Sequence, residues 1–236
     1  MAKALFDRAV AMIGLVVLSP LLVIVCALVW LQDLRSPFYV ALRAARGGGS
    51  FRMVKIRSMV SHADRIGSNS TSADDPRVTR IGRFVRNWKI DELSQLWNVL
   101  KGDMSLVGPR PQVLEEVDTY SDTEKALLTV RPGITDFASI VFADEGAILA
   151  GAVDPYQTYV RLIRPWKSRL GLFYVQHRTF LVDLRLIQLT VLRIVAPRRA
   201  LAGVCRLLEG LGAPEDLVRV AGRNAALDSQ GLPGSA

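Results

Sequence analysis

The chain has 236 residues and a net charge of +8, and half of its residues are apolar. Its length holds one domain of ordinary size plus an anchor, and its two cysteines, both set among apolar residues, exclude a disulfide framework and fit a reducing compartment. The positive balance indicates an anionic partner (nucleic acid, an acidic lipid surface or a phosphorylated substrate), although a general solubility charge explains it equally well at this point.

The N-terminal part carries a long apolar segment. Residues 10–31 contain no charge in 22 positions, which is long enough to cross a bilayer as one helix and too long for a typical signal-peptide core. Pro20 falls near the centre, and a mid-helix proline kinks or breaks a helix because it removes a backbone hydrogen bond. Ser19 can donate its hydroxyl to a freed carbonyl, which lowers the cost in lipid.

Charges on both flanks bear on how this segment meets the membrane. Lys3 and Arg8 precede it, and Arg35, Arg43 and Arg46 follow it. Positive residues at both ends are typical of a helix that enters and leaves on the cytoplasmic face. Each arm on either side of the proline is about 15 Å long, near half the hydrocarbon thickness. A re-entrant hairpin and a kinked spanning helix both remain open on these residues.

Four further elements are predicted before the middle of the chain. Residues 37–57 are typical of a β-hairpin around a triple glycine at 47–49. Residues 77–87 predict a short basic helix, 91–100 predict an amphipathic helix, and 112–129 are helical in pattern.

The C-terminal half is predicted to be helical. Residues 156–195 indicate at least two helices, and the later one, from Asp183, has an apolar face that suits either a membrane surface or the protein core. Residues 198–236 end in a Gly, Ala and Ser-rich stretch, for which we predict fraying.

An acidic pair opens the amphipathic helix. Alone, Asp91 and Glu92 are typical of residues that cap a helix start. Basic residues in segments that can face the same place change this interpretation; they are Lys55, Arg57, Arg86, Lys89 and Arg110. Two carboxylates among basic groups can hold Mg²⁺ and meet a diphosphate, and one of them can act as a nucleophile that forms an acyl-phosphate.

Arg110 lies between Pro109 and Pro111, which fix the local φ angles and limit the wandering of the arginine. A preorganised guanidinium suits bidentate phosphate binding, and a plain turn with a surface arginine is the alternative. His62 and His177 stand alone, so a histidine-based triad has little support. The sequence contains no phosphate-binding P-loop, no complete dinucleotide fingerprint, no Cys/His metal spacing and no nucleic-acid motif.

Taken together, these residues resemble the bacterial sugar transferase family, the monotopic polyprenol-phosphate phosphoglycosyl transferases. The resemblance runs from about Lys3 to Ile194. The motifs that carry it, in the family's order, are FDR at 6–8, LSP at 18–20, KIRSM at 55–59, DDPRVTRIGRF at 74–84, IDELSQLWNVLKGDMSLVGPRP at 90–111 and RPGIT at 131–135.

The resemblance implies an enzyme that moves a sugar phosphate from a UDP-sugar to undecaprenyl phosphate with Mg²⁺ and releases UMP. It implies the cytoplasmic face of the bacterial inner membrane, an early step of exopolysaccharide or glycoconjugate assembly, contact with membrane lipids and no nucleic-acid partner; homo-oligomer formation stays open. Carried onto this chain, it makes Asp91 the nucleophile of a covalent intermediate and Glu92 its partner, with the metal held by both. The implied substrate and phosphate contacts are Lys55, Arg57, Arg86, Pro109, Arg110, Pro111 and Arg131, and the implied membrane break is Ser19-Pro20.

The implied fold is mainly α with a small β element, an α+β monotopic membrane protein with a re-entrant helix-break-helix and surface amphipathic helices. The expected organisation is a re-entrant membrane helix at 1–35, a cytoplasmic catalytic domain at 36–197 and a C-terminal tail at 198–236, amphipathic and then flexible. This corresponds to the minimal catalytic unit of the family.

Two departures from the family pattern leave the sugar open. After RPGIT many relatives continue with a Gln-Val-Asn-Gly-Arg-like segment, whereas residues 136–151 here read DFASIVFADEGAILAG, and the tail after Pro197 has no family counterpart. The alternative function is a non-enzymatic membrane scaffold that binds acidic lipid or nucleic acid, which does not explain an acidic pair within a basic set. A degenerate relative without chemistry is a third possibility, and the intact IDEL and GPRP segments argue against it.

Overall fold

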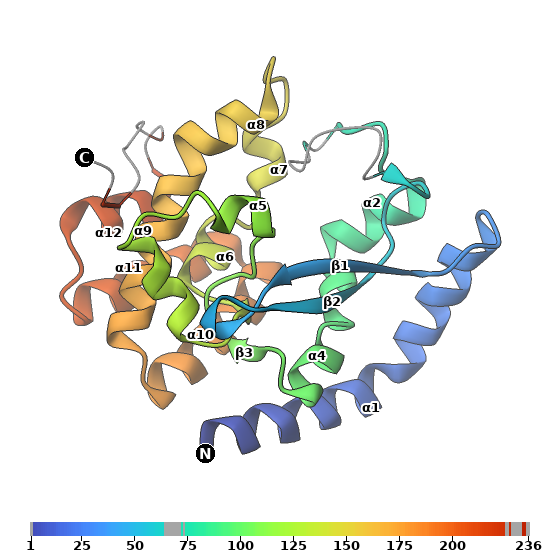
Figure 1. The fold of residues 1–236 in the computed structure, drawn as a ribbon, viewed down its shortest axis with the longest axis horizontal. Helices are drawn as coiled ribbons and strands as arrows, with labels where there is room; N and C mark the ends of the chain where they lie inside the picture. The colour runs from blue at the N-terminus through green and yellow to red at the C-terminus, as the bar shows by residue number, and fades with distance from the viewer. Residues whose placement is uncertain (1, 64–71, 73, 225–226, 228–232, 235–236) are drawn as a thin grey trace.

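Helices dominate the structure, a computed structural model that describes residues 2–63, 72, 74–224, 227 and 233–234 (Figure 1). The mainly α fold with a small β element is therefore confirmed. The α-helices are α1 Ala2–Leu31, α2 Arg80–Asn87, α3 Ile90–Leu93, α4 Leu96–Lys101, α5 Leu114–Val117, α6 Phe137–Val141, α7 Glu145–Ile148, α8 Pro155–Thr158, α9 Arg164–His177, α10 Phe180–Val195, α11 Pro197–Gly210 and α12 Glu215–Gly222. The strands are β1 Phe38–Ala44, β2 Ser50–Ile56, β3 Ser105–Val107 and β4 Gly133–Thr135; 3₁₀ helices span Arg46–Gly48 and Glu124–Thr129, and a π-helical turn spans Tyr159–Ile163.

The apolar segment forms one continuous helix, α1, which includes Pro20. The Ser19 hydroxyl donates a hydrogen bond to the Val16 carbonyl at 2.8 Å, which is the acceptor that the proline nitrogen cannot use. The path of α1 bends along the lower right of the molecule (Figure 1). The predicted helix-break-helix is thus corrected to a single bent helix, because a local side-chain bond replaces the one that proline removes.

The N-terminal end of α1 is fastened to the body of the protein by polar contacts. Lys3 Nζ lies 2.5 Å from a carboxylate oxygen of Asp183 on α10, and the Ser105 hydroxyl of β3 donates to Asp7 at 2.7 Å. Asp7 and Asp183 are both buried. Burial is the main cause that raises the pKa of Asp7, and the Ser105 hydroxyl and Lys3 oppose it. Buried carboxylates with such partners fix the start of the helix against the C-terminal half of the chain.

The second half of α1 also packs on the body, although most side chains of the helix are not buried. Val25 and Val29 are buried in a small apolar cluster. The other buried members of that cluster are Ile56, Val85 and Ile90. Only 11% of the most apolar window of α1 is buried, and its composition is that of a helix able to cross a membrane. A helix with so much apolar surface on its outer side needs a further apolar environment there.

The β1–β2 hairpin is bordered by the helices that follow it. Its strands pair antiparallel from Phe38 opposite Ile56 to Ala44 opposite Ser50, as the sequence predicts. The free edge of β2 bonds to the fully buried side chain of Asn98 on α4, which accepts from the Val54 N–H at 2.9 Å and donates to the Arg52 carbonyl at 2.7 Å. Asn98 therefore takes the place of a third strand and holds α3 and α4 beside β2.

Replacing Asn98 by Ala is expected to lower the free energy of unfolding by about 2–3 kcal/mol, because two backbone groups of β2 lose their partners. Urea unfolding in mild detergent micelles measures the change. Lys101→Ala on the exposed side of the same helix is the matched control, for which we expect a loss below about 0.5 kcal/mol. A loss for Asn98→Ala no larger than that of the control would show that these bonds do not hold the hairpin.

The second sheet holds two glycines against each other. Strand β3 pairs in parallel with β4, with Ser105 opposite Gly133 and Val107 opposite Thr135. A Cβ on Gly133 would lie only 2.1 Å from the backbone nitrogen of Gly108, which follows β3. Only glycine permits this approach. The loop that leaves β3 is therefore fixed at its first residue.

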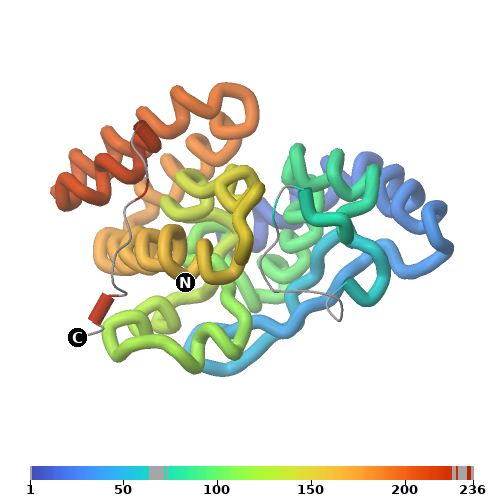
Figure 2. Tube along the Cα trace, turned by 90° about the horizontal axis from the view of Figure 1, so that it is seen from above, coloured from blue at the N-terminus to red at the C-terminus, as the bar shows by residue number. Residues whose placement is uncertain are grey.

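The C-terminal helices form the other side of the molecule. Helix α9 supplies the fully buried Trp166 and Tyr174, and α10 packs mainly on α11 and α6 with Leu186 and Leu189 buried. The exposed apolar residues of α10, Val191 among them, lie on its other side, so its apolar surface divides between core and exterior. Helices α11 and α12 form a hairpin on α6, α9 and α10 (Figure 2). Most of the tail beyond residue 224 lies outside the described residues.

Candidate active site

The acidic pair lies on the short helix α3. The predicted helix 91–100 is divided into α3 and α4 by a turn at Ser94-Gln95. The Ser94 hydroxyl lies 3.2 Å from the Val54 carbonyl of β2, and this contact brings α3 to the hairpin. Asp91 is only 9% exposed, and its Oδ1 atom is buried with no hydrogen-bond partner among the described residues. A buried carboxylate oxygen without a partner is costly to maintain and marks a site for a missing ligand.

Glu92 forms an ion pair with the arginine of the proline-flanked loop. Arg110 donates to a carboxylate oxygen of Glu92 at 2.6 Å. Burial pushes the pKa of Glu92 upward, but the positive charges of Arg110 and Lys55 outweigh it and lower the pKa to about 2. The charge of Glu92 in turn raises the pKa of Arg110 further above its ordinary value. Both partners therefore stay charged throughout the physiological range.

The loop that carries Arg110 is held rigid by its two prolines and by backbone contacts. Pro109 and Pro111 are buried while Arg110 is half-buried. The Gly133 N–H donates to the Pro109 carbonyl at 3.0 Å, which adds to the glycine contact with Gly108 described above. The guanidinium is thus presented to Glu92 by fixed φ angles and a fixed base.

Lys55 reaches the same place from strand β2. Burial lowers its pKa to about 8, and the positive charge of Arg110 adds to this shift while Glu92 and Asp91 oppose it. For Asp91 the net shift of the pKa is upward. Burial raises the pKa of Asp91, the charge of Lys55 opposes the rise, and Glu92 adds to it. The lysine is therefore the main group that favours the ionised form of Asp91.

Arg86 on α2 is the fifth member of this cluster. Its Nε donates to the Ser58 hydroxyl at 2.8 Å, and the charge of Asp91 acts against the burial that lowers its pKa. Helix α2 approaches Ser58 closely, because a Cβ on Gly82 would lie 1.8 Å from the Ser58 carbonyl oxygen. Gly82 and Ser58 together set the position of Arg86.

Two predicted contacts stand apart from this cluster. The guanidinium of Arg57 makes two short bonds to the Asp33 carboxylate, at 2.5 and 2.6 Å, beyond the end of α1. The bond to Arg57 lowers the pKa of Asp33. Arg57 thus links the hairpin to the end of α1 and lies apart from the Asp91 cluster, and its contact with phosphate stays a prediction. Arg131 lies two residues before β4, with its carbonyl beside Gly108.

The structure adds neighbours that sequence patterns did not single out. Arg43 of β1 lies near Arg110, whose charge adds to the burial that lowers the pKa of Arg43. Glu145 of α7 also acts on Arg110 and forms an ion pair with Lys167 of α9. A recess beside Arg110 is lined by further charged and phenolic groups; they include Glu116, Tyr120, Asp136, Tyr159, Arg164 and Lys167. Their convergence depends on contacts between distant segments, so no local signal could have found them.

The acidic pair fits a magnesium ion that is shared with a substrate. Mg²⁺ is usually held by one or two carboxylates together with substrate phosphates. Asp91 offers an unpartnered buried oxygen, and Glu92 is adjacent to it. Within the described part of the chain, no group of three or more His, Cys, Asp or Glu side chains could form a metal site made of protein alone.

Comparison with known proteins places the chain in a family. Residues 1–197 match the family described as bacterial sugar transferase. The chain is 38% identical to the exopolysaccharide production protein ExoY of Sinorhizobium fredii over 57% of its own length and 66% of that protein. It is 44% identical to a putative undecaprenyl-phosphate N-acetylgalactosaminyl 1-phosphate transferase of Bacillus subtilis, over 47% of the chain and 62% of the relative.

A third relative is the UDP-glucose:undecaprenyl-phosphate glucose-1-phosphate transferase of Xanthomonas campestris, at 33% identity over 84% of the chain and 40% of the relative. The chain thus spans less than two thirds of the length of each of these three relatives. The family match covers every residue of the acidic and basic cluster built above. The chain is a member of the bacterial sugar transferase family.

Proposed function

We propose that the protein transfers a sugar phosphate from a UDP-sugar to undecaprenyl phosphate, through a covalent intermediate on Asp91, and releases UMP. The observation that carries the proposal is the buried, unpartnered Oδ1 of Asp91, which is surrounded by Lys55, Arg86 and the Glu92–Arg110 pair. The names of two relatives, from Bacillus and Xanthomonas, refer to transfer to undecaprenyl phosphate. The product would begin the assembly of an exopolysaccharide or another glycoconjugate.

In the first displacement, a carboxylate oxygen of Asp91 attacks the β-phosphorus of the UDP-sugar. A bond forms between this oxygen and phosphorus, and the bond from phosphorus to the bridging oxygen breaks. The bridging oxygen keeps the electron pair and leaves as part of UMP. Lys55 and Arg86 are the cations placed to balance the phosphate charge as it shifts during the attack.

In the second displacement, a phosphate oxygen of undecaprenyl phosphate attacks the same phosphorus. The bond between Asp91 and phosphorus breaks, the carboxylate is regenerated, and the sugar leaves on a lipid diphosphate. Splitting the transfer in this way lets two large substrates react one after the other at a single carboxylate. Glu92 and Arg110 hold their charges throughout and position the loop beside the nucleophile.

Asp91 and Glu92 are the residues that would hold Mg²⁺ against the diphosphate of the donor. When bound, the ion would neutralise part of the phosphate charge during transfer.

The alkaline side of the pH profile is expected to depend on Lys55. Its pKa is lowered to about 8, so the ammonium is present below that pH and is lost as the pH rises through it. If the ammonium binds phosphate, kcat/KM for the UDP-sugar falls about tenfold per pH unit above this value, since kcat/KM reports groups of the free enzyme. In Lys55→Arg the decline moves beyond the measured range, because a guanidinium keeps its proton. An unchanged alkaline limb in Lys55→Arg, with Lys101→Arg as control, would assign the decline to another group.

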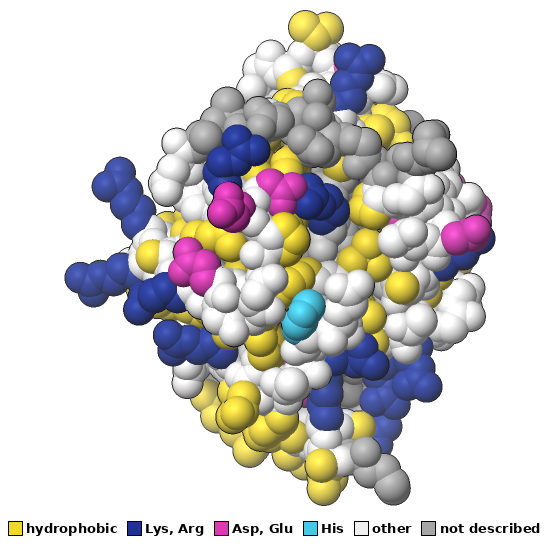
Figure 3. Space-filling view, turned by 90° about the vertical axis from the view of Figure 1, so that its left-hand side faces the viewer, with side chains coloured by type: hydrophobic (Ala, Val, Ile, Leu, Met, Phe, Trp, Pro, Cys, Tyr) yellow, Lys and Arg dark blue, Asp and Glu magenta, His cyan; other side chains and the backbone are white. Residues whose placement is uncertain are grey.

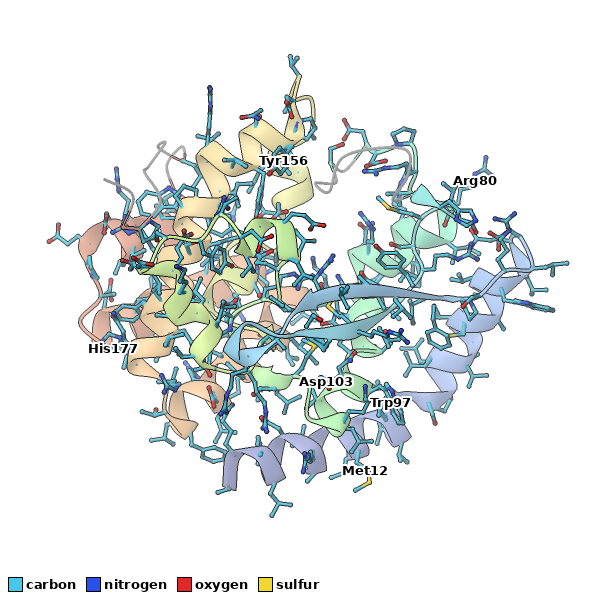
Figure 4. The ribbon with its side chains drawn as sticks, viewed as in Figure 1. Met12, Arg80, Trp97, Asp103, Tyr156 and His177 are labelled. Atoms are coloured by element: carbon cyan, nitrogen blue, oxygen red, sulfur yellow. The ribbon has the colours of Figure 1, made fainter. Side chains whose placement is uncertain are left out.

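We further propose that α1 is re-entrant and that the domain lies on the cytoplasmic face of the inner membrane. The two ends of α1 contact the same body, through Lys3 at the start and Val29 near the end. A spanning helix would place its ends on opposite sides of the bilayer. Exposed Met12 on α1 and Trp97 on α4 both lie in the lower part of the molecule (Figure 4), and apolar side chains also gather at the lower edge of the face that Figure 3 shows. An edge of this kind suits the membrane interface.

Cysteine placed at Ala2 tests this arrangement, in a variant whose Cys26 and Cys205 are replaced by Ser and Ala. A membrane-impermeant maleimide added to intact cells is expected to leave this position unlabelled and to label it in inverted membrane vesicles. Labelling in intact cells would reject the re-entrant arrangement. The same substitution at Asp118, exposed on the globular domain, reports the side on which that domain lies.

The function itself is tested by UMP release. The purified chain in nanodiscs, supplied with Mg²⁺ and undecaprenyl phosphate, is offered a panel of UDP-sugars. We expect release of UMP with at least one sugar and none without the lipid acceptor beyond a single turnover. A protein that binds the lipid yet releases no UMP from any UDP-sugar would support a scaffold in place of an enzyme.

A further inference from the structure

The C-terminal hairpin of α11 and α12 is built mainly from residues beyond the family match, which ends at residue 197. It is nevertheless part of the core. Val204 and Leu208 of α11 and Leu217 and Val220 of α12 are buried, and they join the main apolar cluster of the protein. Figure 3 views the side of the molecule on which this hairpin lies, where acidic and basic side chains adjoin. The hairpin is thus an ordered element in contact with the catalytic domain.

The end of this hairpin contacts the segment between α6 and α7. Arg223 ends α12 in the left-handed region, with φ of 54°. Its guanidinium lies 3.5 Å from the Asp144 carboxylate and 5.5 Å from the centre of the Phe142 ring. One side chain therefore combines an ion pair with a cation–π contact. Arg193 of α10 binds Asp144 as well, at 3.6 Å, and donates to the Ile140 carbonyl.

The same short segment is bonded on another side to the helix that carries Asp91. Lys89 Nζ donates to the Ala143 carbonyl at 3.1 Å. Lys89 immediately precedes α3 and is itself in the left-handed region, with φ of 56°. A non-glycine residue in this conformation is strained, so its surroundings must hold it there. Residues 142–144, which we call the strap, are therefore bound by Arg223 and by Lys89.

The residue after the strap acts on the site through its charge. Glu145 pairs with Lys167 of α9, and its charge acts on Arg110. A shift of the strap would therefore affect both halves of the acidic pair, Asp91 through Lys89 and Glu92 through Arg110. Figure 2 shows residues near 150, in yellow, between the orange and red C-terminal hairpin and the green helices α2 to α4.

The hairpin is itself held to the domain by other contacts, which fix the position of the Arg223 backbone. Arg169 of α9 and Asp216 of α12 form an ion pair at 2.6 Å. Gly203 of α11 packs against Leu189 of α10, where an added Cβ would lie 2.4 Å from a leucine methyl. These contacts hold both helices of the hairpin to the domain at points away from the strap.

We propose that the α11–α12 hairpin is a positioning element of the active site, and that Arg223 acts through the strap and Lys89 to hold Asp91 in its reactive position. The proposal rests on the proposed function, since it concerns the rate of attack by Asp91. Arg223 touches neither substrate nor reacting atoms in this arrangement, so it is a positioning residue. Its loss should slow the chemical step and leave the affinity for the donor largely unchanged.

The test compares Arg223→Ala with Arg206→Ala in the full chain in nanodiscs. Arg206 is exposed on α11, and its guanidinium bonds to the Ala202 carbonyl of its own helix. For Arg223→Ala we expect kcat for UMP release to fall about tenfold with KM for the UDP-sugar within about twofold, since small misplacements of reacting groups act on the chemical step. Arg206→Ala should leave both constants unchanged. Arg223→Lys keeps the charge and should recover at least part of the lost kcat.

A double-mutant cycle separates positioning from a general loss of stability. If Arg223 acts through the strap and Lys89, the double variant Arg223→Ala/Lys89→Met should be little slower than the slower single variant. If instead the fold-losses in kcat of the two single variants multiply in the double variant, the two residues act independently, and the proposed path from Arg223 to Lys89 is overturned. So would a variant Arg223→Ala whose kcat equals that of Arg206→Ala. A loss of active enzyme that matches a lowered melting temperature, with normal kcat for the folded fraction, would also overturn it.

These outcomes differ from a failure of the proposed function. If the unaltered chain releases no UMP from any UDP-sugar, the proposed function fails, and the positioning role that rests on it fails as well. If the unaltered chain is active and Arg223→Ala is normal, the function stands and the positioning role is rejected.

Discussion

Replacing Asp91 by Asn is expected to abolish sugar-phosphate transfer while the protein remains folded and bound to membranes. The amide has nearly the shape of the carboxylate but lacks its charge, so it cannot form the bond to phosphorus. Loss of a nucleophile costs about 10⁴-fold or more in kcat. Because burial raises the pKa of Asp91, removing its charge relieves desolvation, and we expect the melting temperature to hold or rise.

Trapping the covalent sugar-phosphate intermediate on the protein tests this prediction directly. A UDP-sugar labelled with ³²P in the β-phosphate, mixed with the enzyme in the absence of undecaprenyl phosphate, should leave the label on the protein. Asp91→Asn should carry none. Asp118→Asn, an exposed carboxylate elsewhere on the domain, should be labelled as the unaltered chain is. Label that persists on Asp91→Asn would assign the nucleophile to another residue.

Replacing Arg110 by Ala is expected to lower kcat/KM by about 10²- to 10³-fold, the effect of removing one fixed charge from a polar site. The same change leaves Glu92 without its principal partner. The pKa of Glu92, now about 2, would rise toward its ordinary value, because Arg110 is the largest influence that lowers it. We expect the free energy of unfolding to fall by about 2 kcal/mol, as a charged hydrogen bond at a half-buried position is lost.

A second substitution separates these two effects. In Glu92→Gln/Arg110→Ala the uncompensated charge is gone, so stability should recover while activity does not. Arg110→Lys keeps the charge without the planar fork and should fall between the unaltered chain and Arg110→Ala in activity. Arg52→Ala, an exposed arginine on β2, is the control for a general loss of positive charge. Normal kcat/KM in Arg110→Ala would remove Arg110 from the site.

The parts of the fold that follow from local patterns could be predicted from the sequence. The triple glycine at 47–49 marks the β1–β2 turn, and Gly47 has φ of 83° there. The predicted helix at 112–129 instead forms α5 and a 3₁₀ helix. The break falls where the Ser121 N–H bonds to the Glu124 carboxylate and the Ser121 hydroxyl accepts from the Glu124 N–H. Such local bonds compete with the helix, and apolar periodicity does not report them.

The candidate site likewise contains residues that could be predicted from the sequence and contacts that could not. Asp91, Glu92 and Arg110 all belong to the family motif at 90–111. They come together once α3 contacts the loop after β3. Arg57 stands in such a motif too, but its partner Asp33 comes from 24 residues earlier, where no pattern marked it. The contact between Arg223 and Asp144 joins residues 79 apart. Pairings of this kind are set by packing, and a single sequence does not reveal them.

The bond between Lys3 and Asp183 has a consequence for biosynthesis. The two residues are 180 positions apart, so α1 is fixed at its start only after α10 has left the ribosome. At 5–20 residues per second this delay is about 10–40 s. During that interval α1 has apolar surface that the body of the protein does not cover, and early transfer to a bilayer would shield it. With α1 placed in the membrane as proposed, delivery to the bilayer therefore precedes completion of the fold, and the globular domain matures on the membrane surface.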